Sequence, residues 1–416
     1  MKILMRSFSL IFISYALAMA GIFACIVFFS ADDWWQLKTQ LVDWDSEHYN
    51  AIRECGYDDL TQAFFPLFPF LWRWSGLGTY GICLLNLAIF GGGLWALWRE
   101  FQWNTRWLPL YLATPMLIFM ALPYTEATFF LFSAVLLIGL HRRNLWLTCA
   151  AILLCSLTRP TYTILLPALF LVEWLTEANG RTLLLRCALY TLCAGISTAA
   201  VLLLQHADTG EWFGYIDAQK YWGHRFGIPR LPLFSWKSGT PLLTDIVLRT
   251  DASGILFGAI SLISLSAVGL QRLRHGISLL SRPLICSLLY CVGICASLLL
   301  FKGGCVNSVA RYIFGSVFFL VLAQHVWENW RLSAGQIALL FVAILAFFLL
   351  AFGGHGHSTL PFAGRHAIAA AYWVIAALVV SKPTWLRRLS YAAFFLLNVV
   401  LSQYFYWSFL HHYWIE

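Results

Sequence analysis

The first candidate for chemistry is an acidic and aromatic stretch, WDSEHYNAIRE, at residues 44–54. If this stretch is helical, Asp45, His48 and Tyr49 share one face, because residues three and four apart are neighbours on a helix. Trp44 and Tyr49 flank the carboxylate and should partly exclude water. Exclusion of water favours proton uptake by a carboxylate, so Asp45 is the candidate general base. The alternative is a solvated loop acid beside a surface histidine of an interfacial helix.

An aromatic run, AFFPLFP at residues 63–69, follows this helix after Gly56. A residue that precedes a proline is pushed out of the α region, so we expect residues 64–69 to be largely extended. The whole stretch is thus predicted to form a short helix, a turn and a stiff aromatic strap.

The composition is that of a membrane protein. Hydrophobic residues make up 60% of the 416 residues and charged residues only 11%, whereas soluble domains are about 45–50% apolar and about 25% charged. Only helices or closed barrels satisfy the backbone in hydrocarbon, and the apolar runs lack the two-residue alternation of barrel strands. We therefore predict an all-α, polytopic membrane protein, in contact with the lipid bilayer, with a single domain over residues 1–416.

Thirteen apolar runs are candidates for transmembrane helices. The first is longer than the roughly 7–15 apolar residues of a signal peptide, so we expect an uncleaved span. Two neighbouring runs, 145–158 and 160–175, fall short of the roughly 20 residues that a straight span needs. Because Arg159 and Pro160 separate them, we expect a tilted or re-entrant hairpin there. The thirteen predicted spans are 8–29, 79–98, 107–121, 124–140, 145–158, 160–175, 183–204, 254–270, 284–301, 312–326, 333–351, 367–381 and 389–409.

The formal net charge of +8 is explained by membrane orientation. With these spans, most Lys and Arg residues fall on one side, which is cytoplasmic by the positive-inside rule, and nearly all acidic residues fall on the other. The charge therefore does not point to a nucleic-acid partner. Connections at 30–79, 205–253 and 352–366 lie on the outer side, and loops of such length are usually functional. We expect the chemistry on this extracytoplasmic face, with interfacial helices in the first loop.

Two charged residues lie beside apolar spans. Glu126 lies in the PYTE sequence at 123–126. It either faces the same cavity as Asp45 or is an acid in the first turn of a helix, where the helix dipole stabilises a negative charge. Arg159 interrupts an apolar stretch, and such charges usually face a polar cavity or a partner. A phosphate is one candidate, because a guanidinium binds it in a bidentate manner. A structural ion pair with Glu126 is the other.

A second group of polar residues enters the predicted span 312–326 from the outer side. Lys302 is followed by two glycines, and Asn307, Arg311 and Tyr312 come next. Two cations, an amide and a close backbone approach would suit an anionic head group. The alternative is ordinary interfacial Lys and Arg side chains that extend to the membrane surface.

The stretch 219–225, with Gln219 and Trp222, interleaves polar and aromatic residues. This pattern is expected of a sugar-binding surface and equally of an interfacial aromatic belt. Most of the twenty tryptophans belong to such a belt.

No metal or other cofactor is expected. Most cysteines lie in apolar spans without a CxxC pair, as small packing residues do. His355, His357 and His366 have no acid at ligand spacing. The sequence leaves open a disulfide between Cys55 and Cys305.

The first loop resembles the signature of the GPI mannosyltransferase II (PIG-V) family and its bacterial relatives, within the GT-C membrane glycosyltransferases. That signature has WD, then H-F/Y, then GY, then AFFPLYP-like residues, and these elements stand here in order over 44–57 and 63–69. Weaker similarity extends to 123–126, 218–222 and 307–312. One departure is RPTY after the fifth span, where eukaryotic members have Arg-Ser-Asn-Gly.

The resemblance implies a GT-C-like fold and transfer of a hexose, usually mannose, from a polyprenyl phosphate sugar to a glycan, lipid or protein acceptor. The active site would be extracytoplasmic, in a bacterial inner membrane or, in a eukaryote, the endoplasmic reticulum. Asp45 would be the catalytic base, and His48 would orient it or the acceptor. Arg311 and Arg159, with Lys302 assisting, would bind the donor phosphate. The residues expected to shape the sugar and acceptor sites are Trp44, Tyr49, Glu126, Gln219, Trp222, Asn307 and Tyr312.

Two other classes of function remain open at this point. A transporter or flippase of a lipid-linked or sugar substrate also needs many spans and intramembrane charge, but inverted repeats with broken helices would be expected, and none is visible in the sequence. A membrane acyltransferase that relies on His48 is the third class.

Overall fold

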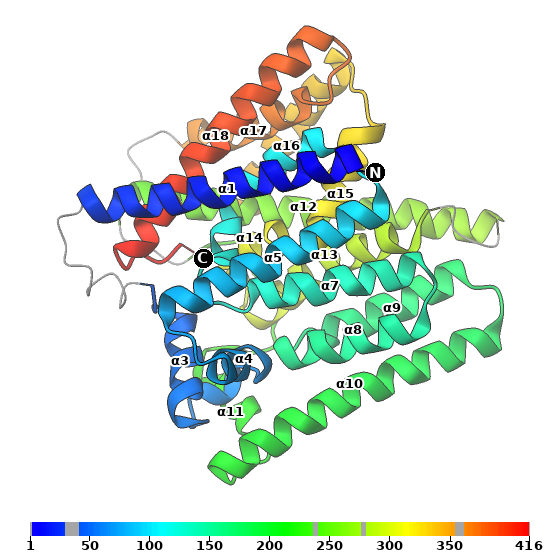
Figure 1. The fold of residues 1–416 in the computed structure, drawn as a ribbon. Helices are drawn as coiled ribbons and strands as arrows, with labels where there is room; N and C mark the ends of the chain where they lie inside the picture. The colour runs from blue at the N-terminus through cyan, green and yellow to red at the C-terminus, as the bar shows by residue number, and fades with distance from the viewer. Residues whose placement is uncertain (1, 30–40, 236–239, 276–279, 354–361, 416) are drawn as a thin grey trace.

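The computed structural model describes residues 2–29, 41–235, 240–275, 280–353 and 362–415, and within these ranges the chain is helical, without a β-strand. The longer helices, labelled in Figure 1, are α1 (Lys2–Phe29), α5 (Thr79–Phe101), α7 (Glu126–His141), α8 (Leu145–Thr158), α9 (Tyr162–Thr176), α10 (Gly180–Thr209), α12 (Pro241–His275), α13 (Arg282–Phe301), α15 (Val317–Asn329), α16 (Ala334–Phe352), α17 (Phe362–Leu378) and α18 (Thr384–Leu410). The short ones are α3 (Asp45–Cys55), η1 (Thr61–Ala63), α4 (Leu67–Ser75), η2 (Thr105–Trp107), α6 (Leu108–Leu112), η3 (Pro115–Met120), α11 (Gly214–Tyr221) and α14 (Val309–Phe314).

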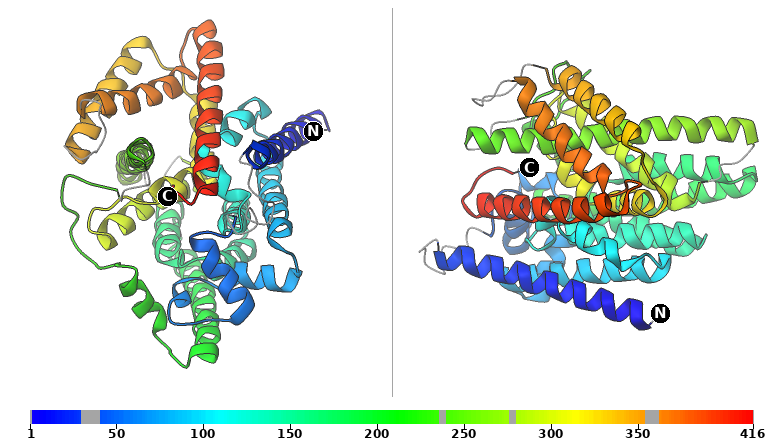
Figure 2. Two further views of the ribbon diagram at one scale, coloured as in Figure 1. Left: turned by 90° about the vertical axis from the view of Figure 1, so that its left-hand side faces the viewer. Right: turned by 90° about the horizontal axis from the view of Figure 1, so that it is seen from above.

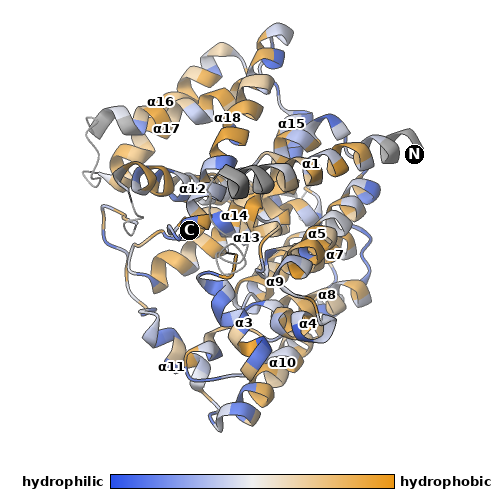
Figure 3. Ribbon diagram, turned by 60° about the vertical axis from the view of Figure 1, so that its left-hand side comes forward, coloured by the Kyte–Doolittle hydropathy of each residue, from blue (hydrophilic) through white to orange (hydrophobic). Residues whose placement is uncertain are grey.

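Six of the described helices are long and apolar enough to cross a membrane: α5, α10, α12, α13, α16 and α18. Several shorter apolar helices lie among them, and many of the long helices run in similar directions (Figure 2). Figure 3 shows mainly hydrophobic residues on these helices and hydrophilic residues gathered around α3 and α11. The architecture is therefore compatible with a multi-pass membrane protein, while thirteen spans and a GT-C fold stay predictions.

The expected span at 107–121 is not one helix. It consists of η2, α6 and η3. Thr114 has an extended ψ of 124° before Pro115, because proline lacks an N–H and disfavours the α region of the residue before it. Leu117 is fully buried. Irregular backbone of this kind is tolerated at membrane depth where protein surrounds it.

The expected span at 312–326 is also broken, between α14 and α15. Ser316 is extended and its hydroxyl accepts a hydrogen bond from the N–H of Phe319, which caps α15. A Cβ on Gly315 would lie 2.7 Å from the carbonyl oxygen of Arg311, so this close turn requires glycine. The break leaves Arg311 on a short helix of its own.

Two loop predictions need correction. The aromatic strap expected at 64–69 is extended only at its beginning, because α4 starts at Leu67. Pro69 lies in the first turn of α4, where a missing N–H costs nothing. The second loop, expected at 205–253, is shorter, since α12 begins at Pro241 and carries Asp251, which is buried. The residues 30–40, 236–239 and 354–361, with His355 and His357, lie outside the described part of the chain.

The lengths of α7, α8 and α9 matter for the site. They have 16, 14 and 15 residues, or roughly 21–24 Å at about 1.5 Å per residue, less than the roughly 30 Å of a hydrocarbon core. Their neighbour α10 has 30 residues. Figure 1 shows α10 continuing past α8, with α3, α4 and α11 beside its far end. Beyond the ends of these short helices the first loop contacts the end of α10, where the Tyr57 N–H donates to Asp208 at 2.9 Å and the Gln205 amide donates to the carbonyl oxygen of Gln62 at 2.8 Å.

A buried ion network joins α9, α10 and α13. Glu173 is fully buried and accepts hydrogen bonds from Arg186 at 3.1 Å, from Arg282 at 3.3 Å and from the hydroxyl of Tyr190 at 2.8 Å. Charges inside an apolar protein persist only when they are paired. This carboxylate therefore fixes three helices at the end of the molecule that charge counting assigns to the cytoplasm.

Replacing Glu173 with Leu should lower the stability of the protein by about 3–5 kcal/mol, because the buried Arg282 and the half-buried Arg186 lose the carboxylate that they share. The melting temperature of detergent-solubilised protein measures this loss. Glu177→Gln is the matched control, since Glu177 is more exposed and lies 3.6 Å from Arg282. Equal melting of wild-type protein and the Leu variant would show that the network does not hold these helices.

Candidate functional site

The acid of the first loop begins a helix, as predicted. Asp45 is the first residue of α3, where a negative charge favours the helix dipole. Gly56 follows the helix with φ of 87°, a conformation that glycine adopts without strain. The preceding residue, Trp44, also has a positive φ, 55°.

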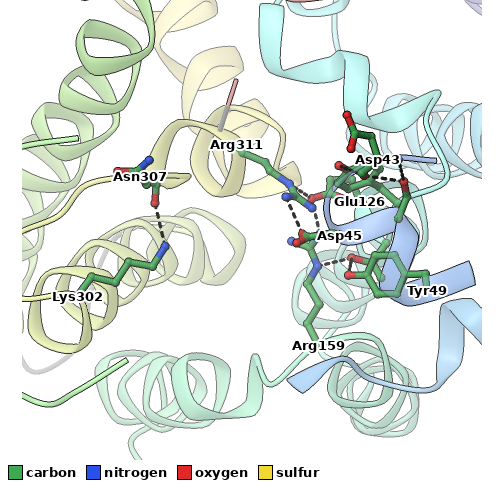
Figure 4. Close-up of polar contacts among 11 residues, drawn as sticks. Asp43, Asp45, Tyr49, Glu126, Arg159, Lys302, Asn307 and Arg311 are labelled. Carbon is green, nitrogen blue, oxygen red and sulfur yellow. Dashed lines mark hydrogen bonds and ion pairs between the residues drawn. The ribbon is translucent and has the colours of Figure 1, made fainter. Parts of the chain in front are cut away.

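Four charged side chains meet at one point, which we call the charged centre: Asp45, Arg311, Glu126 and Arg159. Arg311 donates from Nη1 to Asp45 Oδ2 at 2.9 Å and from Nε to Glu126. Arg159 donates to the same oxygen of Glu126. Figure 4 shows Arg311 between the two carboxylates. The ion pair of Arg159 with Glu126 that the sequence offered as an alternative is therefore present.

These side chains differ sharply in exposure. Arg311 and Glu126 are 2% and 4% exposed as residues. The Asp45 side chain is 26% exposed and that of Arg159 is 12% exposed. Asp45 is therefore the member of the charged centre that an incoming molecule reaches most easily.

The four residues come from elements far apart in the sequence. Asp45 lies on α3, Glu126 begins α7, Arg159 follows α8 and Arg311 lies on α14. Thr125 links two of these elements, because its hydroxyl accepts from Arg159 Nε at 2.6 Å and lies 3.4 Å from the Tyr49 hydroxyl. Sequence reasoning did not single out Thr125, although it stands beside Glu126 in PYTE.

Aromatic rings enclose the two arginines. The Arg311 guanidinium lies 4.6 Å from the ring centroid of Tyr124 and 4.7 Å from that of Phe119. The ring centroid of Tyr312 lies 5.6 Å from the Arg311 guanidinium and 5.3 Å from that of Arg159. Ring faces stabilise cations and exclude water, so an anion that reaches these guanidinium groups would meet little competition from solvent.

His48, about one turn after Asp45 on α3, packs against aromatic rings. Its ring stacks on Phe64 at 4.6 Å and meets the edge of Trp222 at 5.2 Å. Burial lowers the pKa of His48 below its usual value, although the charges of Asp45 and Glu47 oppose this shift. The ring is therefore neutral at neutral pH. Within the described residues no hydrogen bond joins His48 to Asp45, so its orienting role stays a prediction.

Three other predicted residues are not part of the charged centre. Lys302 donates to the carbonyl oxygen of Asn307 at 3.2 Å, and Figure 4 shows both residues apart from the four charged side chains. Gln219 forms a hydrogen bond with His224. Among the residues that the structure describes, no ion pair links Lys302 to either carboxylate.

The loop acid Asp43 has a larger part in the structure than the sequence indicated. Its carbonyl oxygen accepts a hydrogen bond from the Tyr124 hydroxyl at 3.0 Å, and its carboxylate lies 2.8 Å from Nδ1 of His412. Trp44 meets Trp414 edge to face at 4.7 Å. Asp43 stands just before the WD pair, but nothing in the sequence shows that residues near 412 fold back on it.

Neither metal ligands nor a disulfide mark the site. The described part of the chain has no group of three or more His, Cys, Asp or Glu residues that could hold a metal. Cys55 is exposed, whereas Cys305 is buried and its Sγ lies 2.8 Å from Asn307 Oδ1, so the two do not form the disulfide that the sequence left open. The chemistry available at the charged centre is proton transfer at an accessible carboxylate and anion binding at two arginines.

Comparisons of the chain with protein-family models, with curated proteins and with solved structures found no match.

Proposed function

We propose that this protein is a glycosyltransferase that moves a hexose, mannose by the family resemblance, from a polyprenyl phosphate sugar to an acceptor hydroxyl, with inversion, on the extracytoplasmic side of a membrane. The observation that carries the proposal is the pairing of a partly accessible carboxylate, Asp45, with a deeply buried guanidinium, Arg311, at 2.9 Å. Such a pair places a proton acceptor next to a binding group for a phosphate.

The proposed reaction uses both members of the pair. Asp45 takes the proton of the acceptor hydroxyl, and the acceptor oxygen forms a bond to the anomeric carbon. The bond from that carbon to the phosphate oxygen breaks on the opposite face, and the electron pair leaves with the polyprenyl phosphate. Arg311 stabilises the negative charge that the phosphate gains, as preorganised charges do in a site from which water is excluded.

The ion pair of Asp45 with Arg311 lets the donor control when Asp45 is free to act as a base. Arg311 is held on one side by Glu126, which is buried, and on the other by Asp45, which is accessible. A phosphate that approaches Arg311 competes with Asp45 more easily than with Glu126. Donor binding would therefore release the Asp45 carboxylate, so that the base is free only when the sugar to be transferred is present.

The aromatic surface beside α3 suits the acceptor. Trp222 is 38% exposed and lies against the neutral ring of His48, and apolar ring faces beside polar groups are the usual partners of sugar rings and other amphipathic molecules. A lipid-linked donor also explains a protein rich in apolar helices, because an isoprenoid chain stays in the bilayer while its phosphate reaches Arg311.

Asp45→Asn should lower the transfer rate by about 10²–10⁴, since general base catalysis contributes that much. The assay incubates purified protein in vesicles with radiolabelled polyprenyl phosphate mannose and a membrane extract, and measures labelled product. Glu47→Gln, an exposed acid on the same helix, is the control and should keep wild-type turnover. Full turnover by the Asn variant would remove Asp45 as the base, and movement of intact donor without a new glycosidic bond would indicate a flippase.

Arg311→Lys should lower the transfer rate by about 10²–10³, the usual effect of removing one preorganised donor to a developing charge. Lysine keeps the charge but lacks the planar fork of donors with which the guanidinium holds Glu126 through Nε and Asp45 through Nη1. The measurement is kcat/KM for the labelled donor, with melting temperature as the check on folding. Arg225→Lys, on an exposed loop, is the control, and equal effects of the two changes would contradict a phosphate role for Arg311.

A further inference from the structure

The backbone at Trp44 decides where Asp45 points. Trp44 has φ of 55° and ψ of −125°, in a region that residues other than glycine rarely occupy and that persists only where surrounding contacts impose it. Because Asp45 is the next residue and begins α3, these two angles set the direction in which the helix leaves the loop. Whatever holds Trp44 therefore also holds Asp45 toward Arg311.

Local hydrogen bonds hold one side of this turn. The Trp44 N–H donates to Asp43 Oδ1 at 3.0 Å, and the Ser46 hydroxyl donates to the Asp43 carbonyl oxygen at 2.7 Å. The Tyr124 hydroxyl donates to the same carbonyl oxygen at 3.0 Å. Asp43 is thus the centre of the turn, and one oxygen of its carboxylate remains for a further partner.

That partner comes from the segment after α18, residues 411–415. His412 Nδ1 lies 2.8 Å from Asp43 Oδ2. Trp414 meets the ring of Trp44 at 4.7 Å with perpendicular planes, the edge-to-face geometry that aromatic pairs favour. Ile415 is 2% exposed, so the segment is packed against the rest of the protein.

We propose that His412 and Trp414 are positioning residues for Asp45: they hold Asp43 and Trp44 in the turn that directs the Asp45 carboxylate at Arg311. The catalytic consequence rests on the proposed function, whereas the structural role does not. Trp414 carries most of this role, because its contact lies on the strained residue itself, while the His412 side chain is 57% exposed and exposed ion pairs contribute little.

The chain offers a matched control at the neighbouring position. His411 is an exposed histidine of the same segment, and its ring contacts Trp407 of α18 at 4.2 Å. Replacing it removes a ring from the same segment without touching the turn. A fall in activity that is specific to position 414 or 412 therefore reports on the turn itself.

The kinetic test compares Trp414→Ala, Trp414→Phe and His411→Ala in the labelled-donor assay. A misdirected carboxylate should lower kcat about tenfold to hundredfold, since small misplacements of a reacting group have effects of this size. The donor KM should not rise, because Glu126 still holds Arg311 and a misdirected Asp45 competes less with the phosphate for that guanidinium. Trp414→Phe keeps an edge-to-face ring and should recover most of kcat. Unchanged kcat in Trp414→Ala, or an equal fall in His411→Ala, would overturn the proposal.

A second measurement separates this proposal from the proposed function. Hydrogen exchange followed by mass spectrometry should show faster exchange over residues 43–49 in Trp414→Ala and no change there in His411→Ala. Unchanged exchange would overturn the positioning role even in an active enzyme, and faster exchange would support it even if wild-type protein transferred no sugar. If Trp414→Ala fails to fold, kcat and hydrogen exchange over residues 43–49 are measured for His412→Ala instead. The fall in kcat and the faster exchange should then be smaller, and no change in either would overturn the proposal.

Discussion

The burial of one guanidinium is the constraint on which the rest of the site depends. Arg311 is 2% exposed, and a cation in such a place requires carboxylates within hydrogen-bonding distance and rings around it. Glu126 and Asp45 supply the charge, and Phe119 and Tyr124 supply the rings. Each of these residues must reach Arg311 from a different element, so the arrangement of those elements is fixed at this point.

The helix breaks serve the same constraint. Arg311 reaches the charged centre from α14, a short helix that ends at Gly315 before α15 begins. Arg159 reaches it because α8 ends there and Pro160 prevents the helix from continuing. Breaks of this kind expose backbone polar groups, which membrane proteins tolerate where protein or a polar cavity surrounds them. Arg311 and Arg159 of the charged centre therefore both lie next to a helix break.

Much of this could be predicted from residue types and spacing. The helix at 44–54 was predicted with its end at Gly56, although no side-chain cap begins it, and the pairing of Arg159 with Glu126 was one of the two alternatives that the sequence left open for a deep charge. The segments at 107–121 and 312–326 were predicted as continuous spans because their hydrophobicity matches one, although Pro115 and Gly315 mark the places where the structure breaks them. Whether a helix breaks at such a point depends on whether other parts of the protein surround the exposed backbone groups.

Contacts between distant residues set the other limit on prediction. The contact of His412 with Asp43 joins residues 369 positions apart, and no local pattern signals it. The same holds for the choice of Asp45, among several acids in the first loop, as the partner of Arg311. Helix periodicity places an acid on a face, but only the tertiary fold, which brings the first residue of α3 to Arg311 of α14, selects the cation that it meets.

The central claim is that the donor phosphate takes the place of Asp45 on Arg311. An experimental structure of the protein with a polyprenyl phosphate bound tests it most directly. We predict a phosphate oxygen at about 2.7–3.2 Å from the Arg311 guanidinium, with Glu126 still in contact and the Asp45 carboxylate released toward the acceptor side. A bound phosphate elsewhere, with the ion pair of Asp45 and Arg311 intact, would contradict the account.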